Sequence, residues 1–303
     1  MKYFIYFITL LLVGCSPKKD STPIPSNGKI VRLENFQSKY VSPRNIDIWL
    51  PDGYSPEKKY AALYMHDGQM LYDSTKTWNG QEWRIDEVLS QLIDEKKVKE
   101  CIVVGIWNDK AKRYADFFPQ KALNYIKSKE AEDLVRNLFN GEPLADNYLH
   151  FIVNEVKPYI DKNYNTYTDP KNTYIMGSSM GGLISIYAIC EYPQVFGGAA
   201  CLSTHWVGDL KASFKEIPQA INSYLLENLP DPLTHKIYFD YGTKTVDSLY
   251  KPSQQMVDGT MKLKGYNEIN WRTIEFKGDD HSERSWSKRL NIPLSFLLAT
   301  DNK

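Results

Sequence analysis

The sequence predicts an α/β fold in which a mostly parallel central sheet carries helices on both faces. The region 31–65 consists of short strand-like runs separated by turn residues. After it, apolar strand runs alternate with stretches in which apolar residues have helical spacing. Several of these runs are apolar throughout, as strands buried on both faces are. Opening hairpins followed by repeated β–α units give this layered arrangement.

Each element follows from its own pattern. Strands are expected at 31–40, 45–50, 60–65, 101–106, 174–176, 196–202, 236–241 and 271–276. Helical spacing predicts helices near 85–93, 149–160, 183–189 and 286–298. The region 119–146 breaks the rhythm, with a charged helical piece at 126–139. It is either a lid over a site or a surface insertion, and the sequence leaves both readings open.

The N-terminus has the pattern of an export signal. One positive charge precedes an apolar run of eleven residues, 3–13, which is too short to span a bilayer. The segment Leu12-Val13-Gly14-Cys15 resembles a bacterial lipobox, in which the cysteine is lipidated. An ordinary signal peptide with an incidental cysteine is the alternative.

The expected organisation follows from that signal. Residues 1–14 form a lipoprotein signal peptide, 15–29 a flexible tether anchored through Cys15, and 30–303 one folded domain. The only expected membrane contact is this lipid anchor, in the bacterial cell envelope on the periplasmic side or the outer surface.

Composition excludes several classes of function. Lys+Arg and Asp+Glu both number 37, so the chain is neutral, whereas nucleic-acid binders are normally basic. The remaining cysteines, Cys101, Cys190 and Cys201, are too few for a disulfide framework, and a Cys190–Cys201 bridge has no support beyond its feasibility. The five histidines are too scattered to suggest a zinc site, so we expect no metal and no cofactor.

The segment Gly177-Ser178-Ser179-Met180-Gly181 fits the G-x-S-x-G pattern of a nucleophile elbow. The pattern alone is weak, but here a short apolar strand precedes it and a helix that is apolar nearly all round follows it. Such a turn places the serine hydroxyl above the sheet, next to the free N–H groups of the helix N-terminus. We therefore predict that Ser179 is a nucleophile.

The base can be sought by elimination among the five histidines. A serine needs a histidine held by a carboxylate, and behind an elbow of this kind the chain order is serine, acid, histidine. His66 and His150 come too early, and His205 leaves little room for an acid before it. His235 precedes a strand, at the end away from the site. His281 follows the last strand, at its carboxyl end, and is the predicted base.

The acid is expected after the strand at 236–241. Asp247 lies in the loop that follows this strand, where sites of parallel sheets are found. Asp240 lies inside the strand and is the rival. The oxyanion hole then needs the N–H of Met180 and a second N–H from the loop after an early strand. Gln69, after the turn residue Gly68, is placed to supply it.

Five stretches together resemble the putative-esterase family of α/β-hydrolases. They are 44–51, 63–69, 177–182, 239–243 and His281 before Trp286, and the likeness runs from about Val31 to the C-terminus. This family includes esterase D-like enzymes, feruloyl and acetylxylan esterases, enterochelin esterases and mycolyltransferases. The resemblance implies the α/β-hydrolase fold, and it matches Ser179, Asp247, His281, Met180 and Gln69 to the family's catalytic positions. Arg113 and Asp116 match a stretch where relatives often have Arg and Glu, so Asp116 departs from the pattern.

The expected function is serine carboxylic-ester hydrolysis through an acyl-enzyme, with feruloyl or acetyl esters of polysaccharides as substrates. Three alternatives remain: a siderophore lactone esterase, an acyltransferase in which a sugar hydroxyl replaces water, and a non-catalytic, lipid-anchored carbohydrate-binding protein. Seven tryptophans and 21 tyrosines supply aromatic faces that stack on sugars or cinnamoyl groups. Trp206 and Trp107 follow strands at their carboxyl ends, so they are candidate substrate contacts. Arg113 is a third candidate.

Overall fold

The computed structural model describes residues 22–139, 141–208 and 215–300. An eight-stranded sheet forms its centre, in the order β1-β2-β4-β3-β5-β6-β7-β8. The strands are β1 Lys29–Phe36, β2 Arg44–Leu50, β3 Ala61–His66, β4 Cys101–Ile106, β5 Thr173–Ser178, β6 Gly198–Leu202, β7 Lys236–Gly242 and β8 Trp271–Phe276. The β1–β2 and β2–β4 pairs are antiparallel and all later pairs are parallel. The predicted α/β-hydrolase fold class is therefore confirmed.

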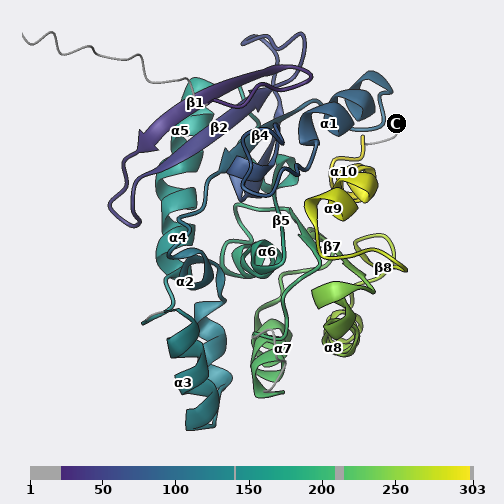
Figure 1. Cartoon of the computed structure of the whole chain (residues 1–303). Helices are drawn as coiled ribbons and strands as arrows, with labels where there is room; N and C mark the ends of the chain where they lie inside the picture. Colours follow the sequence, from purple (N-terminus) through teal and green to yellow (C-terminus); the bar gives the residue numbers. More distant parts are fainter. Residues whose placement is uncertain (1–21, 140, 209–214, 301–303) are drawn as a thin grey trace, which may run out of the picture.

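Helices cover both faces of this sheet (Figure 1). They are α1 Ile85–Asp94, α2 Arg113–Phe117, α3 Lys129–Leu138, α4 Ala145–Phe151, α5 Lys157–Asn163, α6 Met180–Glu191, α7 Glu216–Asn228, α8 Lys251–Leu263, α9 Glu283–Arg289 and α10 Asn291–Leu297. The predicted helix near 149–160 is α4 and α5 joined by a wide turn at Ile152–Val156. No helix in the described ranges is long and apolar enough to cross a membrane.

Side chains of the central strands point alternately to the two faces of the sheet, so each face carries its own hydrophobic core. On β3, Ala62 and Tyr64 pack with α6 and α4, whereas Leu63 and Met65 pack with α1 and α10 on the other face. Because both faces are buried, these strands read as continuous apolar runs.

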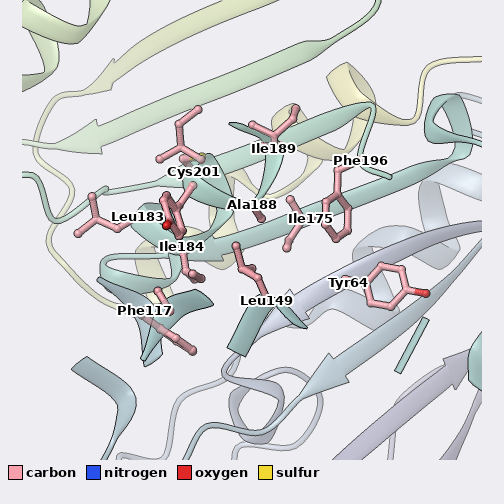
Figure 2. Packing of buried hydrophobic residues seen from close by; sticks show 14 of the residues in the cluster. Tyr64, Phe117, Leu149, Ile175, Leu183, Ile184, Ala188, Ile189, Phe196 and Cys201 are labelled. Carbon is pink, nitrogen blue, oxygen red and sulfur yellow. The ribbon is translucent and has the colours of Figure 1, made fainter. Parts of the chain in front are cut away.

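Helix α6 lies at the centre of the larger core and is buried on every side. Figure 2 shows its side chains, Leu183, Ile184, Ala188 and Ile189, among neighbours from several elements: Ile175 of β5, Cys201 of β6, Leu149 of α4 and Phe117 of α2. The helix ends before Tyr192-Pro193, as predicted, because a proline ring cannot continue it. Because the helix is buried on every side, its N-terminus has a fixed position directly after Ser179 and β5.

The N-terminal segment differs from the expected tether. Cys15 and the signal peptide lie outside the described residues. Residues 24–28, however, are fastened to the domain: Ile24 N donates to Asp73 Oδ2 at 3.2 Å and Ser26 N to Asp86 Oδ2 at 2.7 Å. The indole of Trp49 also donates to Asn27 O at 2.7 Å. These bonds hold residues 24–28, the last part of the expected tether, against the domain.

Candidate active site

Ser179 occupies the sharp turn between β5 and α6. Its backbone has φ 58° and ψ −122°, a conformation that is strained for a residue with a Cβ. The turn is possible because Gly177 passes Gly181 closely: a Cβ on Gly177 would lie 2.9 Å from the Gly181 carbonyl carbon. The Ser179 N–H donates to Leu202 O of β6 at 2.9 Å. The elbow therefore has a defined backbone.

Asp247 and His281 meet at the carboxyl ends of β7 and β8. Asp247 Oδ1 lies 2.5 Å from His281 Nδ1, and Asp247 is fully buried. Asp247 Oδ2 accepts hydrogen bonds from Gly242 N and Ser203 Oγ, both at 2.6 Å. With one oxygen held by donors and the other facing the imidazole, the carboxylate is fixed in orientation.

The rival acid, Asp240, is directed elsewhere. It is buried and forms an ion pair with Arg289 at 2.9 Å, and it also accepts from the Ser203 N–H. Burial raises the pKa of Asp240, and the charge of Arg289 opposes that rise. Arg289 further bonds Asp279 and the Ser203 hydroxyl. Asp240 therefore supports the loop behind Asp247 and does not contact His281.

The turn after β3 forms the other side of the site. Asp67 has φ 57°, and Gly68 begins the short 3-10 helix Gly68–Met70. Only glycine fits at position 68, because a Cβ there would lie 2.4 Å from the Gly105 carbonyl carbon. Met180 is the first residue of α6, where an N–H has no acceptor within the helix. Gln69 therefore lies in the turn after β3 and lines the cavity with Ser179, and Met180 begins the helix that follows Ser179.

Arg113 clamps this turn from α2. Its guanidinium makes two bonds to Asp67, of 2.8 Å and 2.6 Å, and Asn108 donates a third at 2.6 Å. Burial favours the neutral form of Asp67, but the Arg113 charge and these hydrogen bonds outweigh it and lower the Asp67 pKa. The pair is therefore ionised and holds the segment that leads into Gln69.

A cavity of about 700 Å³ joins these parts. Its lining includes Ser179, His281, Gln69 and Arg113, together with residues from two further segments: Trp78, Asn79, Gln81 and Trp83 before α1, and Ser282, Glu283 and Trp286 of α9 and its N-cap. The described residues between 119 and 146 line none of it. The loop before α1, and not the 119–146 region, therefore walls the site.

Two of the predicted substrate residues lie elsewhere. Trp206 is 1% exposed, donates to Gln254 Oε1 at 2.9 Å and packs on Phe239. The expectation that it walls the site is wrong, because the chain turns it into the core. Trp107 donates to Asp47 Oδ2 at 2.8 Å, lies under Arg32 and does not line the cavity. Arg113 does line it, although Asp67 holds its guanidinium.

Three further observations concern residues outside the cavity and the search for a metal site. Asp116 is buried against Arg44 at 3.1 Å, so this departure from the family pattern has a packing role. Cys101, Cys190 and Cys201 are free and buried. Within residues 22–139, 141–208 and 215–300, no group of three or more His, Cys, Asp or Glu side chains is arranged to hold a metal.

The sequence analysis missed Tyr250 and set His205 aside. The Tyr250 hydroxyl lies 2.8 Å from His205 Nδ1, and its ring packs edge-on against the His281 ring. No spacing rule points to Tyr250, which directly follows the turn that carries Asp247. Trp78, which follows the predicted oxyanion loop in sequence, was not among the candidate substrate residues, yet it lines the cavity and is 75% exposed.

Comparison with known proteins shows the family and the fold of this chain. A family model described as "Putative esterase" matches residues 39–297. The uncharacterized protein YbbA of Bacillus subtilis is 24% identical over 262 residues, which cover 84% of this chain and 92% of that protein. A solved ferulic acid esterase superposes with a TM-score of 0.63 at 19% identity, covering 89% of this chain and 98% of that one.

An enterochelin esterase from Shigella flexneri superposes with a TM-score of 0.64 at 15% identity, covering 91% of this chain and 59% of that chain. At such identities the two solved structures show the fold alone. The family match spans most of the chain and includes the elbow, the Asp247 loop and His281. The chain belongs to the putative esterase family and is a carboxylic-ester hydrolase.

Proposed function

We propose that Ser179, His281 and Asp247 form a catalytic triad that hydrolyses acyl esters of polysaccharides through an acyl-enzyme. The observation that carries this proposal is the bond of 2.5 Å between Asp247 Oδ1 and His281 Nδ1, at the rim of a cavity that also contains Ser179. A carboxylate in this position holds the imidazole in the tautomer whose Nε2 accepts the serine proton.

The reaction then follows in two stages. Ser179 Oγ attacks the ester carbonyl while His281 takes its proton, and the N–H groups of Met180 and Gln69 stabilise the oxyanion. His281 returns the proton to the departing alcohol, which leaves an acyl group on Ser179. Water, deprotonated by His281, attacks this ester in turn and releases the acid and free Ser179. Every step uses residues of this chain.

Polysaccharide esters are favoured by the outer part of the cavity. Trp78 exposes three quarters of its surface there, beside the amides of Asn79 and Gln81. An exposed indole stacks on a sugar ring, and amides bond its hydroxyl groups. A solved protein that shares the fold is named a ferulic acid esterase, and feruloyl esters are among the substrates proposed for this chain.

A siderophore lactone is the second candidate, favoured by Lys110 and Arg113 in the cavity lining. Asp67 neutralises Arg113, however, and Glu283 adds a negative charge to the same lining. The cavity therefore offers little net positive charge to a catecholate, and sugar esters come first.

The test is an activity screen of residues 22–303 against feruloyl, acetyl and catecholate esters, with fluorophosphonate labelling of the same preparation. We expect hydrolysis of a sugar-linked ester and labelling of Ser179. The folded Ser179→Ala variant should show neither. Labelling without hydrolysis, combined with transfer to an added sugar, would identify an acyltransferase; neither labelling nor hydrolysis would leave the carbohydrate-binding alternative.

We also propose that the mature chain is anchored in the bacterial cell envelope through lipid on Cys15. The supporting observation is the apolar run 3–13 followed by Leu12-Val13-Gly14-Cys15. The fastening of residues 24–28 to the domain leaves only residues 15–23 as a connection. Such an anchor would hold the site close to the membrane surface.

A further inference from the structure

Tyr250 is buried beneath the proposed triad and is connected to all three of its members. Its N–H donates to Asp247 O at 3.0 Å, and its ring packs edge-on against His281 with 5.9 Å between centroids. Its hydroxyl lies within hydrogen-bonding reach of the Ser179 side chain. Tyr250 is fully buried and does not line the cavity, so it does not contact substrate.

The hydroxyl of Tyr250 is itself held by a second histidine. His205 Nδ1 lies 2.8 Å from it, and the His205 N–H donates to Ser179 O at 3.2 Å. His205 is 2% exposed, so its ring has little freedom to move. His205 and Tyr250 therefore form a chain of polar contacts that begins and ends on Ser179, once through its backbone and once through its side chain.

We propose that Tyr250, held by His205, is a positioning residue that fixes the rotamer of Ser179 and thereby keeps its hydroxyl beside His281. A serine side chain has three staggered rotamers, and only one of them brings Oγ to the imidazole. A contact with Tyr250, which does not line the cavity, restricts the Ser179 side chain and leaves the substrate side of its hydroxyl open. This inference rests on the proposed function of Ser179 and His281.

The chemistry of the phenol suits this role. Burial raises the pKa of Tyr250 and the charge of Asp247 raises it further, whereas the contact with Ser179 lowers it. The side chain therefore remains a neutral phenol, which both donates and accepts. It holds Ser179 Oγ without removing the proton that His281 must take.

Tyr250→Phe tests the proposal because it removes only the hydroxyl and keeps the ring against His281. Tyr241→Phe is the matched control: Tyr241 belongs to the same small apolar cluster, but its hydroxyl donates to Glu275 at 2.9 Å. We expect Tyr250→Phe to lower kcat roughly tenfold at unchanged KM, the usual scale for one lost hydrogen bond. Tyr241→Phe should keep kcat. Equal kcat in the two variants, or a raised KM with normal kcat, would overturn the proposal.

A second measurement does not depend on activity. Urea midpoints of wild type, Ser179→Ala, Tyr250→Phe and the double variant form a cycle that isolates the contact between the two side chains. We expect the two substitutions to be non-additive, because either one alone removes the contact; strict additivity would exclude it. If the wild type hydrolyses no ester, the proposed function fails, but this cycle still decides whether Tyr250 holds Ser179.

Discussion

The Asn79 amide donates a hydrogen bond of 2.9 Å to Glu283 Oε2, which joins the loop before α1 to the residue two positions after His281. A second bond follows, from Arg284 N to Gln81 Oε1 at 3.2 Å, and Trp83 packs against Trp286 with 5.4 Å between ring centroids. Two segments about 200 positions apart are thus fastened together across the cavity. Trp78, the neighbour of Asn79 in the first of these segments, also lines the cavity and is 75% exposed.

This placement predicts a substrate-specific effect of Trp78→Ala. We expect KM for a sugar-linked feruloyl or acetyl ester to rise roughly tenfold, the scale of one aromatic stacking contact. KM for a small aryl acetate, which does not reach the rim, should stay near the wild-type value. Trp78→Phe, which keeps an aromatic face, is the control and should recover most of the affinity. Equal losses on both substrates would assign Trp78 to loop packing instead.

The assignment of the acid predicts opposite outcomes for two aspartates. Asp247→Asn should lower kcat by several orders of magnitude, because the imidazole loses the partner that sets its tautomer. His281→Ala should lose at least as much. Asp240→Asn should act mainly on stability, because its partner is Arg289. Steady-state kinetics and circular dichroism on the same samples separate the two effects. Full activity in Asp247→Asn with loss in Asp240→Asn would reverse the assignment.

The clamp on Asp67 predicts that Arg113→Lys is not a conservative change. A lysine replaces two parallel bonds by one point contact, so the turn that carries Gln69 is held less well. We expect kcat to fall about tenfold with little change in KM, less than the loss of an oxyanion donor itself. Lys110→Met, at another cation of the cavity lining, is the control and should leave kcat for a neutral ester intact. A large rise in KM for a catecholate ester in both variants would favour the siderophore reading.

The fastening of the N-terminal segment predicts a pH-dependent stability term. Burial and the neighbouring Glu87 raise the pKa of Asp86 to about 7, while the N–H groups of Asn27 and Ser26 oppose the rise. A raised pKa means that the folded state binds this proton more tightly than the unfolded state. Its contribution is therefore full below about pH 4, the usual pKa of an aspartate, and is lost as pH rises through about 7.

Asp86→Asn should accordingly gain stability relative to wild type as pH rises from about 4 to about 8, by on the order of 1–2 kcal/mol after screening by solvent. Urea unfolding at each pH measures this. The exposed Asp52→Asn is the control and should show no such trend. A constant difference between Asp86→Asn and wild type across this range would contradict the prediction.

The lipid anchor predicts the behaviour of Cys15→Ser. Full-length wild type expressed in a bacterial host should partition into detergent and carry lipid on Cys15 by mass spectrometry. Cys15→Ser should lack lipid and should either retain its signal peptide or appear in the soluble fraction. Cys101→Ser, at a buried thiol, is the control and should be lipidated normally. An unlipidated, soluble wild-type protein would exclude the anchor.

The sequence by itself determined the fold class, most strands and the residues expected to form the triad. Those predictions rest on local or ordered features: apolar runs such as 101–106, the glycines around Ser179, and the chain order of Ser179, Asp247 and His281. The roles of Gly177 and Gly68 could be predicted, because at each of them the backbone passes another segment too closely for a Cβ. The positions of Asp247 and His281 follow because parallel strands bring their carboxyl ends to one edge.

Only the tertiary structure decided what surrounds those residues. The sequence favoured Trp206 over Trp78, because Trp206 follows a strand at its carboxyl end, yet Trp206 is buried on Phe239 and Trp78 is exposed at the cavity. The direction of a loop side chain depends on contacts between distant segments, and these leave no periodic signal. For the same reason the sequence did not predict that Tyr250 and His205, which come from different loops, contact each other next to Ser179.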